Sequence, residues 1–117
     1  MGSGEKRREE RIQPLIVRCR VLAEGRSPWP AYVTELSLAG ARVSGESEPP
    51  PPGTRLTLEL DFGPGQARPR LQAELRWSSA AGRGHDFGVS FTGGSGEERE
   101  LLAATLDEFR RRAALLQ

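Results

Sequence analysis

The sequence predicts a mainly β fold: a six-stranded antiparallel β-barrel with a flexible N-terminal arm and a C-terminal α-helix. Six short segments alternate apolar with polar residues, as strands with one buried face do. The 14 glycines and 9 prolines among 117 residues supply turns between such short elements. A chain of this length forms one domain with a small core. The strand pattern alone also fits a sandwich, and of the two we expect the barrel.

The chain begins with a polar and charged segment, residues 1–13, which has too few apolar groups to fold alone. We expect this segment to be a flexible basic arm and residues 14–117 to form a single domain. In the first strand Val17, Cys19 and Val21 share one face. The one cysteine of the chain is therefore expected to be a small core residue rather than a reactive thiol.

The fourth strand shows the clearest alternation, with Leu56, Leu58 and Leu60 on one face and Thr57 and Glu59 on the other. Glycine and proline clusters separate it from its neighbours, and a proline run ahead of it cannot donate hydrogen bonds to a sheet. The expected strands cover residues 15–21, 31–36, 41–44, 56–62, 71–77 and 87–91.

Both tryptophans border the expected strands. Trp77 ends the alternating run of the fifth strand, so we expect it in the core or at the barrel rim rather than as a stacking platform for a base. Trp29 lies in Pro28-Trp29-Pro30, which we interpret as a loop because proline has no N–H to donate. Trp29 is expected either to pack under this loop or to make a surface contact.

The last segment is predicted to be an α-helix over residues 96–115. Ser95 and Glu98 form a capping box, in which each side chain bonds the backbone N–H of the other residue. Apolar residues, Leu106 and Phe109 among them, recur at steps of four and three on one face. This stripe is expected to pack across a barrel mouth or, alternatively, to form a short oligomer seam.

Composition argues against several classes of protein. The net charge of +1 is not that of a general nucleic-acid binder, and no apolar run is long enough to span a membrane. One cysteine and one histidine cannot form a metal site by themselves. The sequence has no glycine-rich phosphate loop and no nucleophile elbow, so we expect no enzymatic activity, no metal and no cofactor. Because no secretory leader is recognisable, the expected location is the cytoplasm.

An arginine element precedes the first strand, where Arg7, Arg8 and Arg11 lie in the expected arm. A guanidinium offers a planar fork of donors that matches a phosphate, or the O6/N7 edge of guanine, with two parallel bonds. A lysine would supply only a point charge. These arginines therefore predict an anion site, with a solvated basic arm as the alternative.

An acidic-x-Ser-x-x-Gly element occupies the turn between the second and third strands, with Glu35, Ser37 and Gly40 at its fixed positions. The carboxylate of Glu35 is an acceptor for the N1–H and N2–H₂ donors of guanine, and Ser37 adds a rotatable hydroxyl. Gly40 permits a positive φ or a close backbone approach. A plain β-turn is the alternative interpretation.

Taken in this order, the Arg-x-x-x-Arg element, the acidic-x-Ser-x-x-Gly turn, the strand segment Gly88-Val89-Ser90-Phe91 and the final helix resemble the PilZ domain family over residues 6–110. The resemblance implies binding of the bacterial second messenger cyclic di-GMP. It also implies that the arginines grip phosphates and guanine edges, while the acidic residue and the serine hold another guanine. The ligand-binding residues implied in this way are Arg7, Arg8, Arg11, Glu35, Ser37 and Gly40.

One position departs from the family pattern, because Glu35 stands where the family has Asp or Asn. Its carboxylate reaches one methylene further, and a displacement of about 1 Å matters in a preorganised site. The expected function is that of a small cytosolic cyclic di-GMP receptor that binds on the outer barrel wall and signals in trans to a protein partner. The alternative is a degenerate PilZ-like interaction module, related to pili or motility, that binds no nucleotide. We expect a monomer or homodimer, with no nucleic acid as partner.

Overall fold

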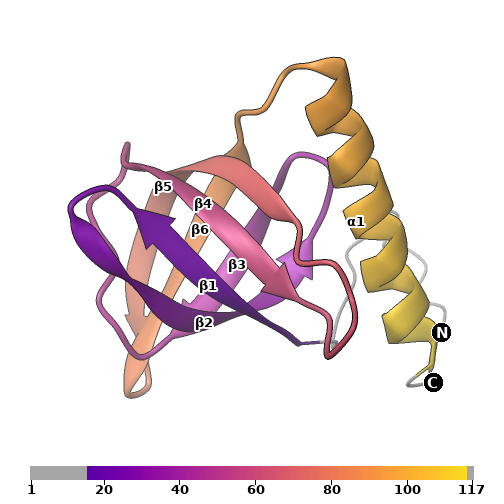
Figure 1. The fold of residues 1–117 in the computed structure, drawn as a ribbon. Coiled ribbons are helices and arrows are strands. Elements are labelled where there is room, and N and C mark those ends of the chain that lie inside the picture. Colours follow the sequence, from indigo (N-terminus) through magenta and orange to yellow (C-terminus); the bar gives the residue numbers. More distant parts are fainter. Residues whose placement is uncertain (1–15, 116–117) are drawn as a thin grey trace, which may run out of the picture.

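The computed structural model describes residues 16–115 and shows a closed barrel of antiparallel strands with a helix beside it (Figure 1). The elements are β1 (Val17–Ala23), β2 (Arg26–Leu36), β3 (Gly40–Gly45), β4 (Arg55–Asp61), β5 (Arg70–Ala81), β6 (Gly84–Phe91) and α1 (Gly96–Leu115). Around the barrel the strands follow the order β1-β2-β3-β6-β5-β4, and β1 pairs with both β2 and β4. The predicted six-stranded barrel with a C-terminal helix is therefore confirmed.

Side chains from all the strands fill the barrel interior. In β1, Val17, Cys19 and Val21 are buried and the residues between them are exposed, as the alternation predicted. Cys19 is 3% exposed, and burial raises the pKa of its thiol to about 12, so it is a core residue. Because side chains fill the interior of such a small barrel, a ligand has room only on the outer wall or at a mouth.

β2 is longer than predicted and includes Pro28, Trp29 and Pro30, so the prediction of a loop at this point is wrong. The pairing of β2 with β3 begins at Tyr32, whereas its pairing with β1 already covers Pro30. The prolines thus lie where β2 has a neighbour on one side only, and there a strand tolerates proline. Trp29 is 5% exposed and belongs to the core.

Two β-bulges change which side chains face outwards. The register between β2 and β3 shifts between Val33 and Glu35, and the register between β5 and β6 shifts between Leu75 and Trp77. After the second shift Trp77 no longer follows the inward alternation, and its side chain is 43% exposed. Of the two places expected for Trp77, the core and the barrel rim, the core is therefore wrong, because the bulge places the side chain on the outer wall.

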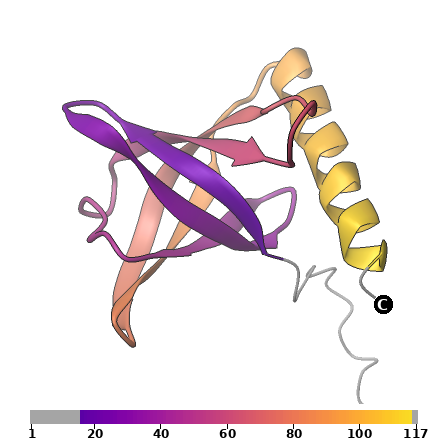
Figure 2. The same cartoon turned by 60° about the horizontal axis from the view of Figure 1, so that its bottom comes forward.

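α1 lies across one end of the barrel, away from the turn that joins β5 to β6 (Figure 2). Its capping box forms as predicted: the Ser95 N–H donates to Glu98 Oε1 and the Glu98 N–H donates to Ser95 Oγ, both at 3.1 Å. Leu106 and Phe109 pack into the core, so the apolar stripe faces the barrel, the first of the two expected arrangements. Within residues 16–115, no helix is both long and apolar enough to cross a membrane.

On the wall formed by β1, β4 and β5, one carboxylate holds two arginines. Glu59 accepts a hydrogen bond from Arg20 Nε at 3.1 Å and another from Arg70 Nε at 3.0 Å. Burial raises the pKa of Glu59, but the hydrogen bonds from Arg70 and Arg20 outweigh it, and the pKa lies below its usual value. This cluster joins three neighbouring strands on their outward side.

The packing of α1 predicts a large effect of one substitution. Phe109 is 0% exposed in the core, so Phe109→Ala should lower the free energy of unfolding by about 3–5 kcal/mol. Leu115→Ala, in the same helix at a residue that is 78% exposed, should change it by less than about 0.5 kcal/mol. Urea unfolding of the full chain followed by circular dichroism measures both. Equal, small effects of the two substitutions would show that α1 does not contribute to the core.

Candidate functional site

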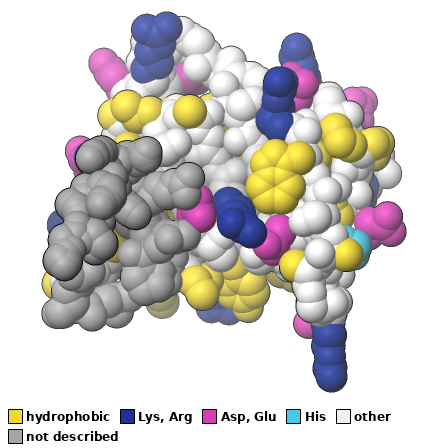
Figure 3. Space-filling view, turned by 180° about the vertical axis from the view of Figure 1, so that it is seen from behind, with side chains coloured by type: hydrophobic (Ala, Val, Ile, Leu, Met, Phe, Trp, Pro, Cys, Tyr) yellow, Lys and Arg dark blue, Asp and Glu magenta, His cyan; other side chains and the backbone are white. Residues whose placement is uncertain are grey.

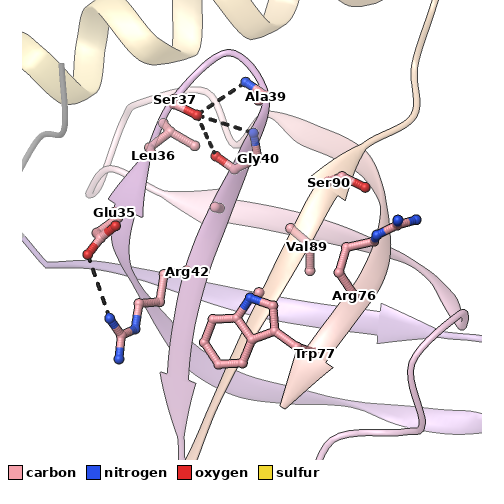
Figure 4. A pocket seen from close by; sticks show the side chains of 12 residues that line it. Glu35, Leu36, Ser37, Ala39, Gly40, Arg42, Arg76, Trp77, Val89 and Ser90 are labelled. Carbon is pink, nitrogen blue, oxygen red and sulfur yellow. Dashed lines mark hydrogen bonds and ion pairs between the residues drawn. The ribbon is translucent and has the colours of Figure 1, made fainter. Parts of the chain in front are cut away.

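A hollow of about 390 Å³ lies on the outer wall of the barrel, where β2, β3, β5 and β6 adjoin. We call it the wall hollow. Figure 3, which views the molecule from behind Figure 1, shows basic, acidic and hydrophobic side chains gathered close together on this side. The lining residues that carry chemistry are Glu35, Ser37, Gly40, Arg42, Arg76 and Trp77 (Figure 4).

The turn between β2 and β3 closes one end of the wall hollow and depends on Ser37. Its N–H donates to the Gly40 carbonyl at 2.9 Å, and its Oγ accepts from the N–H groups of Ala39 at 3.2 Å and Gly40 at 3.3 Å (Figure 4). The hydroxyl hydrogen makes only a long contact, 3.4 Å, with the Gly40 carbonyl. Ser37 therefore shapes the turn mainly through the lone pairs of its hydroxyl oxygen.

Gly40 is needed because two strands come close together. A Cβ at this position would lie 2.0 Å from the carbonyl oxygen of Val89 in β6. Its φ is not among the positive values, which occur at other glycines of the described chain. Of the two reasons for a glycine here that the sequence left open, close backbone approach is the one observed.

Glu35 lies next to a cation that the sequence did not single out. The bulge in β2 places Glu35 opposite Arg42 of β3, and the Arg42 Nη1 atom lies 3.8 Å from Glu35 Oε2. The other terminal nitrogen of Arg42, Nη2, donates to Asp86 Oδ2 of β6 at 2.9 Å. Ser44 donates to the second oxygen of Asp86 at 2.7 Å. One row of polar side chains therefore crosses three strands.

The charge on Asp86 is fixed by this row. The hydrogen bond from Ser44 lowers the pKa of Asp86, partial burial raises it, and the bond and charge of Arg42 lower it further. The net effect holds the pKa below its usual value. Asp86 is therefore a permanent anion at neutral pH and a firm partner for Arg42.

Trp77 and Arg76 of β5 complete the wall hollow. A Cβ at residue 88 would lie 2.2 Å from Trp77 Nε1, so Gly88 leaves the space in which the indole lies against β6. The Arg42 guanidinium carbon is 5.8 Å from the centre of the Trp77 ring, within the range of a cation–π contact. Arg76 is 59% exposed and makes an ion pair of 3.4 Å with Glu74.

Sequence reasoning missed Arg42, Arg76 and Trp77 as members of the site. A glycine inside a strand indicates the close approach of another group. Gly88 was therefore the sequence signal for the contact with the Trp77 indole. The partnership of Arg42 with Asp86 joins residues 44 positions apart in the sequence and left no local signal.

The structure brings together three of the sequence-predicted site residues, Glu35, Ser37 and Gly40, which all line the wall hollow. The other three, Arg7, Arg8 and Arg11, lie outside the described residues. Over the range 16–115, no cluster of His, Cys, Asp or Glu side chains has the composition and spacing of a metal site.

Comparisons with known proteins agree with this fold. The family model described as PilZ domain matches residues 5–108. The PilZ domain of Escherichia coli YcgR, solved with c-di-GMP, is 22% identical with a TM-score of 0.71, and the match covers 93% of this chain and 95% of that chain. The PilZ domain of CeSA from a cellulose-synthesising bacterium is 18% identical with a TM-score of 0.62, over 78% of this chain and 89% of that chain.

A further similar structure is the Bacillus subtilis inhibitor of motility MotI/DgrA, 11% identical with a TM-score of 0.62. This match covers 86% of this chain and 50% of that chain. A comparison with curated protein sequences finds no match. At such identities the structural likeness shows the fold.

The contact between residue 88 and the indole leads to a prediction about the wall hollow. In Gly88→Ala the new methyl group should displace the Trp77 ring, because it would lie 2.2 Å from Nε1 and 2.5 Å from Cε2. The Trp77 indole N–H resonance should therefore move in a ¹H–¹⁵N spectrum, while that of the buried Trp29 stays in place. Gly94→Ala is the matched control, since no heavy atom lies within 4 Å of a Cβ there. Two unmoved indole resonances in Gly88→Ala would contradict the described packing.

Proposed function

Because the chain belongs to the PilZ domain family, we propose that it is a receptor for cyclic di-GMP and that the dinucleotide binds in the wall hollow. One observation carries this proposal: the acidic-x-Ser-x-x-Gly residues line a single hollow together with an exposed tryptophan and two arginines. The similar PilZ domain of E. coli YcgR, whose structure holds c-di-GMP, supports the same ligand.

The chemistry of the wall hollow suits a guanine nucleotide. The Glu35 carboxylate accepts from the N1–H and N2–H₂ donors of a guanine, and Ser37 offers its hydroxyl hydrogen. The exposed face of Trp77 is a surface on which a base stacks. Arg76, which is 59% exposed, has a guanidinium within reach of a phosphate at the edge of the hollow.

In this proposal the arginine element supplies the remaining positive charge. Arg7 and Arg11, with Arg8 beside them, correspond to the family's Arg-x-x-x-Arg element by their order before β1. They bind the phosphates and guanine edges with the planar donor forks of their guanidinium groups.

We further propose how the receptor acts. It works in the cytoplasm, catalyses no reaction, and passes the signal in trans to a protein partner, as a monomer or a homodimer. Glu35, in place of the family's Asp or Asn, favours a second candidate, an interaction module for pili or motility that binds no nucleotide. Calorimetric titration of the full chain with cyclic di-GMP separates the two, since only the receptor gives heat of binding at high micromolar concentration.

The tryptophan of the wall hollow gives a sharp test of the binding site. Trp77→Ala should weaken cyclic di-GMP binding by about 5- to 140-fold, since base stacking contributes about 1–3 kcal/mol and each 1.4 kcal/mol is a factor of ten. Tyr32→Ala is the matched control. Tyr32 of β2 is an aromatic residue with a similar exposure, 46%, but it does not line the hollow. The same calorimetric titration measures both variants. A larger loss in Tyr32→Ala than in Trp77→Ala would move the site elsewhere on the barrel.

The arginine element gives a second test. Arg11→Ala should lose about 1.5–3 kcal/mol of binding free energy, or about ten- to a hundred-fold in dissociation constant, as expected for a charged hydrogen bond. Arg55→Ala removes the same charge from the exposed first residue of β4 and should bind as the wild type does. Unchanged affinity of Arg11→Ala would remove the arm from the site, even if the wild-type protein binds.

A further inference from the structure

Arg42 lies between two carboxylates of different strands. Its Nη2 atom is 2.9 Å from Asp86 Oδ2, a full hydrogen bond, and its Nη1 atom is 3.8 Å from Glu35 Oε2. The Asp86 carboxylate is 18% exposed and is held on its other oxygen by Ser44 at 2.7 Å. One side of the guanidinium is therefore anchored to Asp86 of β6. The other side forms the longer ion pair with Glu35 (Figure 4).

This arrangement reverses the charges of the Glu59 cluster. There one carboxylate is shared by two arginines, whereas here one arginine is shared by two carboxylates, and the group of Glu35, Arg42 and Asp86 keeps a net charge of −1. Exposed ion pairs contribute little to folding stability. The negative charge faces the wall hollow through Glu35, since Asp86 does not line it.

We propose that Arg42 is a positioning residue that fixes the Glu35 carboxylate for a guanine, and that Asp86 and Ser44 hold Arg42 in place for this task. The proposal rests on the proposed function, because the guanine is that of cyclic di-GMP. The proposal explains why an arginine, Arg42, lies beside Glu35. A glutamate side chain has one more rotatable bond than an aspartate and loses more rotamer freedom when it is fixed. Arg42 restricts that freedom before the ligand arrives.

The expected loss of affinity follows from the cost of fixing the Glu35 side chain. Immobilising a rotamer-rich side chain on binding costs about 0.5–1.5 kcal/mol, which corresponds to about two- to tenfold in dissociation constant. Arg42→Ala should therefore weaken cyclic di-GMP binding by about two- to tenfold. Its melting temperature should stay close to that of the wild type, because Arg42 is 46% exposed on the outer wall.

A double-mutant cycle separates positioning from direct contact with the ligand. Calorimetric titrations with cyclic di-GMP are run on the full chain as wild type, Arg42→Ala, Glu35→Asp and the double variant. Aspartate is too short to need the restraint, so Arg42→Ala should cost less than about twofold in the Glu35→Asp chain. The same loss in both chains would mean that Arg42 contacts the ligand itself, and the positioning role would be overturned.

A second arm uses the anchor, which does not line the hollow. Asp86→Asn keeps an acceptor for Ser44 but removes the charge that holds Arg42, so it should weaken binding in the wild-type chain and have no further effect in Arg42→Ala. Independent, additive losses from Asp86→Asn and Arg42→Ala would overturn the proposal. If Glu35→Asp alone abolishes binding, the first cycle cannot be measured, and these two variants then test the positioning role of Arg42. Arg55→Ala again controls for the loss of a positive charge.

Failure of this inference differs from failure of the proposed function. A wild-type chain that gives no heat of binding removes the receptor function itself. A wild-type chain that binds, with Arg42→Ala binding equally well, leaves the receptor in place and removes only the role of Arg42.

Discussion

The structure depends on the closure of its sheet. β1 hydrogen-bonds to β2 on one side and to β4 on the other, so the strands form a closed ring, and the start of β2 is paired on one side only. Closure requires the inward side chains to fill the interior, and they do so with an apolar core to which every strand contributes. Chemistry that involves a polar ligand is thereby moved to the outward faces of the strands. α1 adds Leu106 and Phe109 to the same core and covers one end of the barrel, so the outer walls and the other end remain for a site.

The outward faces acquire a site through two of the register shifts in the barrel. The bulge in β2 brings Glu35 opposite Arg42, and the bulge in β5 turns Trp77 outwards against Gly88. Both bulges border the wall hollow, on opposite sides of β3 and β6. A bulge costs regular pairing and redirects a side chain, and here both redirected side chains point toward one surface.

Much of the fold could be predicted from sequence because the alternation of β1 reports burial directly. In β4 the apolar positions are buried as predicted, but Glu59 on the polar face is also buried, because Arg20 and Arg70 cover it. The capping box at Ser95 and the turn at Ser37 were also predictable, since each is formed by residues three apart. The strand character of Pro28-Trp29-Pro30 was not predictable, because it depends on where β3 begins to pair. The outward position of Trp77 was not predictable either. A bulge is a property of the register between two strands, and the sequence of β5 continues to alternate through it. Arg42 joins the site through Asp86 of a distant strand, so only the folded barrel brings the pair together.

The burial of Cys19 has a practical consequence. It is the one thiol of the chain, it is 3% exposed, and its pKa of about 12 keeps it protonated at neutral pH. The thiolate is the nucleophile toward maleimides, disulfides and oxidants. The folded barrel therefore protects this sulfur in two ways: it keeps reagents away from the side chain, and it keeps the thiol protonated. Alkylation of Cys19 therefore reports on opening of the barrel between β1 and its neighbours. A cysteine introduced on the surface would take a fluorophore or a spin label selectively, without removal of the native thiol.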